Sequence, residues 1–149
     1  MNPAIALYRI GSWFHNHGMK RVGWCFSWVN RFLFSTWVPS SAQIGSGFVC
    51  GYWGLGVVIH KDAVIGNDCT VAQNVTIGRN PGDSRVPVLG DRVYVGAGAV
   101  IVGEITIGRG AVIGANSVVL TDVPAGAVVA GVPARVIRIV ASDAERSSF

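Results

Sequence analysis

A six-residue repeat runs through most of the chain and constrains its fold more than any other feature. Written in sixes, the chain starts at Val38, becomes irregular from Cys50, and continues from Ile59 as IHKDAV, IGNDCT, VAQNVT and IGRN. After a break it resumes at Leu89 as LGDRVY, VGAGAV, IVGEIT, IGRGAV, IGANSV and VLTDVP. The first position is Ile, Val or Leu almost throughout, the second is most often Gly, and the fifth is small or apolar.

A period of six matches neither an α-helix nor the simple alternation of a strand. It fits a short strand, a corner and another short strand, with positions one and five pointing inward. We expect glycine at position two to supply the backbone conformation that a sharp corner demands. Three sixes close one triangular coil, and stacked coils form a parallel β-helix. The sequence therefore predicts a mainly β protein, with about four to five coils over residues 38–140.

The segment 1–37 lies outside the repeat and predicts two helices. Asn2 followed by Pro3 is typical of a helix start, and Gly18 of a helix end. A second helix is expected from about Lys20 to Phe34. At the other end, residues 141–149 carry no repeat and are predicted to form a flexible tail.

The second predicted helix carries an aromatic stripe at four-residue spacing, made of Trp24, Trp28 and Phe32. One interpretation is that this stripe packs on the β-helix or on a neighbouring subunit, as apolar helix stripes commonly do. The other is that the helix lies on an anionic membrane surface. Its aromatic rings would then be buried in lipid, and its basic residues would face the headgroups: Lys20, Arg21 and Arg31.

Charge is scarce and unevenly distributed. Charged residues make up 13% of the 149 residues, and mean hydropathy is +0.46, which excludes a disordered chain. No acidic residue precedes Asp62, so the basic excess belongs to the N-terminal segment. The eight acidic residues of the chain all follow it and are balanced by basic ones there. The repeat region therefore carries no basic stripe, which argues against nucleic-acid binding.

The three cysteines are an odd number and form no C-x-x-C pair, which indicates a reducing compartment and no metal site. No signal peptide is evident. The most apolar stretch, residues 22–38, contains Asn30 and Arg31 and is a poor transmembrane candidate. We therefore expect a cytoplasmic protein. The basic helices add the hypothesis that it works at the inner face of the membrane.

The repeat resembles that of the left-handed β-helix acyltransferases, and most of all their serine acetyltransferase branch. The similarity is carried by four segments: 8–15 (YRIGSWFH), 95–99 (VGAGA), 113–119 (IGANSVV) and 131–137 (GVPARVI). The resemblance implies left-handed coils and transfer of an acetyl group from acetyl-CoA to a hydroxyl. It also implies a homotrimer with the site between neighbouring subunits. The helical region here is shorter than in most full-length members.

The break in the repeat predicts a projecting loop at 79–88, because two prolines and Asp-Ser-Arg cannot continue the strands. The loop leaves from the corner after Ile77. His60 follows Ile59 as Gly78 follows Ile77, so counting places His60 at the same corner, one coil earlier.

His60 is the only histidine outside the helical segment and is the candidate catalytic base. Asp62 or Asp83 could orient its ring. The alternative is that His60 is a structural corner residue at position two of its repeat.

Two departures from the resembled branch concern the acceptor. That branch has an Asp-His pair where Tyr52 and Trp53 stand, and an Arg-His pair where Arg85 and Val86 stand. We therefore favour a sugar of a surface polysaccharide, or of its lipid-linked precursor, as the acceptor. Tyr52 and Trp53 would stack on the sugar ring, with Asp83 and Arg85 as further substrate contacts. Serine O-acetylation in cysteine biosynthesis and an inactive trimeric scaffold that binds a membrane or a partner remain the alternatives.

For CoA, the resemblance implies a groove along the later coils with largely backbone contacts. The matching positions are Gly78, Ala97, Gly98, Ala115, Pro133 and Arg135. Arg135 or Arg138, the basic residues of the closing segment, could meet the nucleotide phosphates.

Overall fold

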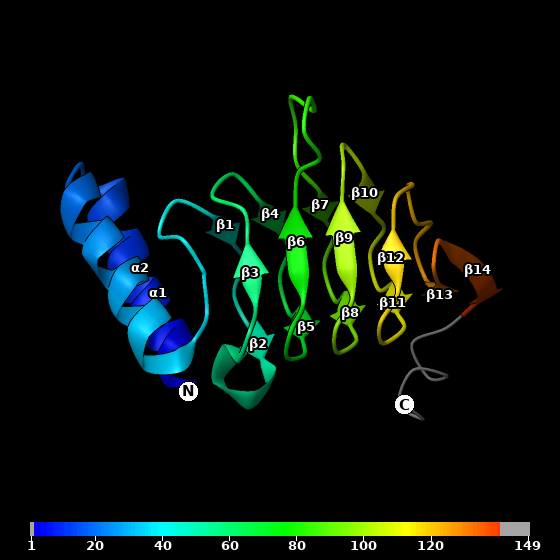
Figure 1. The fold of residues 1–149 in the computed structure, drawn as a ribbon, viewed down its shortest axis with the longest axis horizontal. Helices are drawn as coiled ribbons and strands as arrows, with labels where there is room; N and C mark the ends of the chain where they lie inside the picture. Colours follow the sequence, from blue (N-terminus) through cyan, green and yellow to red (C-terminus); the bar gives the residue numbers. More distant parts are fainter. Residues whose placement is uncertain (1, 141–149) are drawn as a thin grey trace.

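Two helices cover one end of a solenoid in the computed structural model, which describes residues 2–140 (Figure 1). Helix α1 spans Pro3–Asn16 and helix α2 spans Lys20–Phe34, as the sequence predicts. The side chain of Asn2 caps α1 by accepting a hydrogen bond from the backbone nitrogen of Ala4 at 2.9 Å. Gly18, with a φ of +85°, lies in the turn between the helices. The tail predicted at 141–149 falls outside the described residues.

The solenoid is a left-handed parallel β-helix of about four turns, whose short strands stack into three sheets. The first sheet holds β1 (Gln43–Ile44), β4 (Val64–Ile65), β7 (Val88–Leu89) and β10 (Thr106–Ile107). The second holds β2 (Val49–Cys50), β5 (Thr70–Val71), β8 (Tyr94–Val95), β11 (Val112–Ile113), β13 (Ala127–Gly131) and β14 (Ala134–Ile139). The third holds β3 (Val58–Ile59), β6 (Thr76–Gly78), β9 (Val100–Val102) and β12 (Val118–Val119). The pairing is parallel except for the final β13–β14 hairpin.

The core lies inside the triangular coils and is built from positions one and five of the repeat. Ile59, Ile77 and Ile101 stack in register on the third sheet and are fully buried. Position five is equally buried, from Ala63 to Ser117. The inward orientation predicted for both positions is confirmed.

The glycines at position two have a different cause from the one we expected. A Cβ on Gly96 would lie 2.6 Å from the backbone nitrogen of Ala115 in the next coil, which is too close for any side chain. The left-handed backbone conformation falls two residues later, at position four: Gly98 has a φ of +70° and Asn116 of +55°. Position two is therefore glycine because adjacent coils approach closely, and position four makes the corner.

Three rows of corners join the sheets, and each is named here by one residue. The Trp53 corner comprises the turns that follow β2, β5, β8 and β11, including the 3-10 turn η1 at Gly51–Gly54. The His60 corner comprises the turns after β3, β6, β9 and β12. The Asn67 corner comprises those after β1, β4, β7 and β10. Because all coils run in the same direction, equivalent corners stack along the solenoid (Figure 1).

Helix α2 buries its small and polar residues rather than its aromatic ones. Gly23, Ser27 and Asn30 are buried, and the Asn30 amide donates to the backbone oxygen of Ala4 at 2.8 Å. In the aromatic stripe, only Trp24 and Trp28 contact the solenoid side, through the ring of Trp37. Phe32 is 82% exposed. Within one chain, the stripe therefore packs toward the β-helix only in part, through Trp24 and Trp28. Packing on a neighbouring subunit stays a prediction.

The close approach of the coils gives a direct test with a matched control. We expect Gly96→Ala to lower the free energy of unfolding by about 1–3 kcal/mol, because the added methyl group collides with backbone that cannot move aside. Gly78→Ala is the control, since its added Cβ would meet nothing nearer than 3.8 Å. Chemical unfolding at one protein concentration measures both; equal midpoints for the two variants would contradict the steric explanation.

Candidate functional site

His60 lies at the corner that repeat counting gives, immediately after β3. Its backbone nitrogen donates to the oxygen of Ile77 at 2.8 Å, which places it beside Gly78 of the next coil. The side chain is 24% exposed and lines a surface groove together with Trp24, Trp37, Lys61 and Thr76. His60 therefore sits between the aromatic residues near the helices and the exit point of the loop.

The hydrogen bonding of the His60 ring defines its tautomer. The backbone N–H of Asp62 donates to Nδ1 at 3.2 Å, so the neutral ring carries its proton on Nε2. The Asp62 carboxylate lies 3.7 Å from Nδ1 and is paired with Lys61 at 2.9 Å. The ring is thus held as a hydrogen-bond donor at Nε2. Acting as a base through Nε2 would require the proton to move to Nδ1 and the Asp62 contact to break.

The loop predicted at 79–88 rises from the tip of β6 at the His60 corner (Figure 1). Its carboxylate, Asp83, accepts from the backbone nitrogen of Asn80 at 3.3 Å within the loop itself. Arg85 has a side chain 81% exposed and 3.4 Å from Glu104. Among the described contacts, none joins Asp83 or Arg85 to His60.

Glu104 anchors the loop, a role that sequence reasoning missed. Its Oε1 accepts from the backbone nitrogen and the hydroxyl of Ser84, both at 2.7 Å, and from the backbone nitrogen of Arg85 at 3.0 Å. The hydrogen bonds from Ser84 and then from Arg85 lower the pKa of Glu104 to about 2. The strand register could have indicated this role. Gly78 pairs with Val102, so Glu104 lies beside the first residues of the loop.

Tyr52 and Trp53 lie on the other side of the third sheet from His60. Both have left-handed backbone, with φ values of 48° and 56°, and are exposed at 77% and 61%. The Trp53 ring stands edge-on to Phe34 at 6.1 Å and lines an apolar groove with Leu33 and Leu55. Because η1 precedes β3 and His60 follows it, the aromatic pair and His60 lie at opposite ends of strand β3 within one chain.

The positions expected to bind CoA divide between two corners. Ala97, Gly98 and Ala115 lie at the Trp53 corner in successive coils, where the backbone nitrogen of Asn116 donates to the oxygen of Ala97 at 2.8 Å. None has a side chain beyond Cβ, so this strip of backbone is accessible to an extended ligand arm. Pro133 follows in the turn between β13 and β14, and Arg135 is exposed on β14. Gly78 is at the His60 corner instead.

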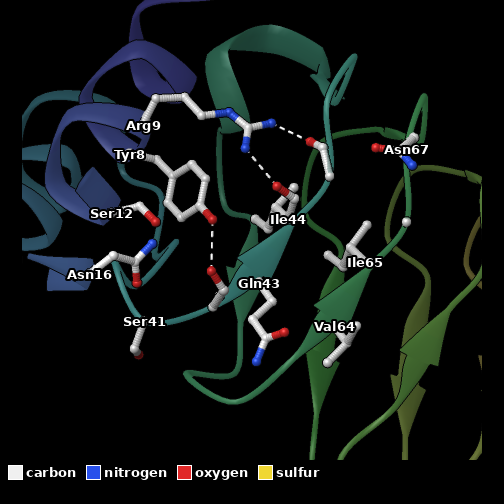
Figure 2. A pocket seen from close by; sticks show the side chains of 13 residues that line it. Tyr8, Arg9, Ser12, Asn16, Ser41, Gln43, Ile44, Val64, Ile65 and Asn67 are labelled. Atoms are coloured by element: carbon white, nitrogen blue, oxygen red, sulfur yellow. Dashed lines mark hydrogen bonds between the residues drawn. The ribbon is translucent and has the colours of Figure 1, made fainter.

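A polar groove between α1 and the first coils is shown in Figure 2. The Tyr8 hydroxyl donates to the oxygen of Ala42 at 2.7 Å, and burial raises its pKa. The Arg9 guanidinium donates to the oxygens of Ile44, at 2.6 Å, and Gly45. Both side chains bind backbone oxygens at the start of the solenoid. They fasten α1 to the first coil, so this groove is a structural joint.

Residues 2–140 contain no metal ligand set, and two of the three cysteine thiols are buried. No group of three or more His, Cys, Asp or Glu gathers within that range. Burial raises the pKa of Cys50 to about 12 and also raises that of Cys69, so these thiols stay protonated at neutral pH. In the described part of the chain, the His60 corner carries both acidic and basic titratable groups: His60, Lys61, Asp62, Arg79, Asp83, Arg85, Glu104 and Asp122.

Comparison with known proteins gives a consistent relationship. A model of the bacterial transferase hexapeptide family (six repeats) matches residues 87–121. The serine acetyltransferase of Escherichia coli (strain K12) is 40% identical over 136 residues, covering 90% of this chain and 50% of that protein. The chain spans about half the length of the curated relatives it matches.

Solved structures agree with the sequence comparison. Serine acetyltransferase from Brucella abortus strain S19 in complex with coenzyme A superposes with a TM-score of 0.87 at 34% identity, over 92% of this chain and 55% of that one. Serine acetyltransferase from Neisseria gonorrhoeae in complex with serine gives a TM-score of 0.83 at 36% identity, over 89% of this chain and 54% of that one.

The anchoring of the loop by Glu104 predicts a specific pattern of amide exchange. In Glu104→Ala, we expect the amides of Ser84 and Arg85 to exchange faster than in the unchanged protein, because their acceptor is gone. Asp122→Ala is the control, because Asp122 accepts from Thr106 at 2.7 Å on the next coil and does not contact the loop. Equal exchange in both variants would show that Glu104 does not hold the loop.

The same contact has a defined pH dependence. The folded pKa of Glu104 lies below its usual value of 4.5, so its contribution is fully present above pH 4.5 and is lost as the pH falls through about 2. Protection of the Ser84 and Arg85 amides, corrected for intrinsic exchange, should therefore be constant from neutral pH to pH 4.5. A loss of protection above pH 4.5 would assign the anchoring to another group.

Proposed function

Because the chain belongs to the hexapeptide-repeat transferases and is serine acetyltransferase-like, we propose that it is an acetyl-CoA-dependent O-acetyltransferase. The observation that carries this proposal is the similarity to serine acetyltransferases over 90% of the chain. Acetyl-CoA would supply the activated acetyl group, and a hydroxyl of a small acceptor would receive it while its proton leaves to the departing thiolate.

Serine is the first candidate acceptor. The relatives are named for serine, and one of the solved relatives holds it. This support is better than any for the sugar that we favoured from the sequence. The weak point is that Trp53 and Val86 stand where the family resemblance places histidines.

A sugar is the second candidate, and the Trp53 corner is the observation in its favour. Two exposed aromatic side chains, Tyr52 and Trp53, stand beside an apolar groove with Leu33 and Leu55. Flat aromatic faces of this kind suit stacking on the apolar face of a sugar ring. A carboxylate that would hold the amino group of serine is absent from these two positions.

The arrangement of the candidates supports a site shared between subunits. One chain holds the aromatic pair and the small-residue strip of Ala97 and Ala115 at the Trp53 corner, and holds His60 and the loop at the His60 corner. In a homotrimer, each interface would bring the Trp53 corner of one subunit toward the loop of the next. We propose this trimer, with the pantetheine arm of CoA along the small-residue strip and Arg135 near its phosphates.

The proposed activity is tested by release of CoA thiol from acetyl-CoA, with serine, free sugars and lipid-linked sugars as acceptors. We expect release with serine. If a sugar is the acceptor instead, Trp53→Ala should raise the KM for that sugar by up to ~10-fold through lost stacking, and Trp13→Ala, an exposed aromatic on α1, should not. Absence of release with every acceptor, together with measured CoA binding, would favour the inactive scaffold.

The contribution of His60 is measured separately. We expect His60→Ala to lower kcat by at least ~100-fold, the usual contribution of a positioned proton-transfer group. His60→Gln distinguishes a catalytic base from a hydrogen-bond donor, because glutamine can donate a hydrogen bond as Nε2 does but cannot act as a base. Most of the activity should survive in His60→Gln if the ring only donates. Unchanged turnover in both variants would remove His60 from the mechanism.

Contact with a membrane through the N-terminal helices is also a proposal. Neither α1 nor α2 has the length and apolar character that a segment crossing a bilayer needs.

A further inference from the structure

Most of the large apolar side chains of α2 point outward. We define the α2 apolar face as six side chains that are between 38% and 82% exposed: Val22, Trp24, Trp28, Val29, Phe32 and Leu33. A helix of a water-soluble domain normally turns such a face toward the core. Here the opposite face is buried, and it consists of Gly23, Ser27 and Asn30.

This orientation is fixed by specific contacts and is not a matter of loose packing. The Ser27 hydroxyl lies 2.9 Å from that of Ser40, and the backbone nitrogen of Ser40 donates to Ser27 at 3.0 Å. A Cβ on Gly23 would lie 2.8 Å from the backbone oxygen of Gly11 in α1. Rotating α2 to bury its aromatic side chains would break these hydrogen bonds and separate the two helices.

The apolar surface continues past the end of α2. Phe34 contacts Trp53, and Leu33 and Phe34 share a groove with Tyr52, Trp53 and Leu55. Tyr52, Trp53 and Leu55 are all at least half exposed. The exposed apolar surface therefore runs from the helix to the Trp53 corner. In the proposed trimer that corner faces the neighbouring subunit, so only the α2 apolar face is assigned to an outside partner.

Positive charge borders this surface. Lys20, Arg21 and Arg31 are exposed on α2 itself. No acidic residue precedes Asp62 in the chain, so none lies on either helix or in the first coil up to that point. A surface that combines tryptophan, phenylalanine and leucine with uncompensated basic side chains matches the interface of an anionic bilayer, apolar below and negative at the headgroups.

We propose that the α2 apolar face docks on an anionic lipid bilayer, with Phe32 and Leu33 inserted among the acyl chains and Arg21 and Arg31 at the headgroups. A second copy of the chain is a poorer occupant. All charged residues of α2 are basic, so a two-fold contact through this face would bring basic side chains of one copy against basic side chains of the other. The proposal stands apart from the proposed acetyl transfer, because it requires only the surface.

Docking would also orient the groove at His60. Trp24 contributes to the α2 apolar face and lines that groove with Trp37 and His60. The groove therefore opens beside the bilayer surface rather than away from it.

The test is flotation of the full chain with vesicles of phosphatidylcholine alone or of phosphatidylcholine with phosphatidylglycerol. We expect binding to the vesicles that contain phosphatidylglycerol and weaker binding at high salt. Phe32→Ser with Leu33→Ser should abolish binding. Arg21→Glu with Arg31→Glu should weaken it by at least ~10-fold, because each basic residue near an anionic surface contributes about fivefold.

Matched controls separate a local effect from a general one. Ile137→Ser removes an apolar side chain that is 65% exposed on β14, and Arg109→Glu reverses an exposed charge at the Asn67 corner. Both should bind as the unchanged protein does, and circular dichroism should show the same fold in all variants. Absence of binding by the unchanged protein, or full binding by both α2 double variants, would overturn the proposal.

A protein partner is distinguished by the molecular mass in solution. If Phe32→Ser with Leu33→Ser lowers the oligomeric state without vesicles present, the face is an interface between copies of the chain and the proposal fails. An unchanged mass together with lost vesicle binding supports the membrane.

Discussion

Backbone hydrogen bonds between successive coils are the constraint on which the rest of this structure depends. Thr76 donates to Ala99 at 3.0 Å and Val58 to Val75 at 2.9 Å, and equivalent bonds continue along each sheet. They hold neighbouring coils at strand spacing, about 4.8 Å. That spacing leaves no room for a side chain at Gly96, and it stacks the isoleucines of position one into a continuous core. Because each coil completes the core of its neighbour, the corners are held rigidly enough to carry function.

Much of the fold could be predicted because the six-residue period repeats often enough to average out local exceptions. The inward positions followed from the period, the projecting loop from its interruption, and the two helices from the capping residues Asn2 and Gly18 outside the repeat. The period could not reveal why position two is glycine, since a positive φ and a close contact select the same residue. It also could not reveal the orientation of α2. The aromatic stripe was visible in the sequence. The buried hydrogen bonds of Ser27 and Asn30 that turn it outward are tertiary contacts, which a periodic pattern does not contain.

The candidate site was predictable in position and less so in chemistry. Counting placed His60 beside Gly78, because equal coil lengths fix which residues stack. The hydrogen bond from the Asp62 N–H to Nδ1 depends on the rotamer of His60. The separation of Trp53 from His60 depends on the direction of β3. Counting repeats could therefore predict neither feature. Glu104 was overlooked although its register was implicit in the repeat. The similarity to serine acetyltransferases supports the reaction class more firmly than the acceptor, because the departures at Tyr52, Trp53 and Val86 lie where the resemblance implies acceptor contacts.

Coil length varies in this solenoid without disturbing strand pairing. The coil from Cys50 to Val71 is three residues longer than the one from Val95 to Ile113, yet both sets of strands pair in regular parallel register. The extra residues form η1 and its exposed aromatic pair. The coil from Ile77 to Ile101 absorbs the whole loop in the same way. Corners of this kind can change in length and sequence independently of the strands. A lineage, or a laboratory library, can exchange the corner segments of such a scaffold one at a time while the core is inherited unchanged.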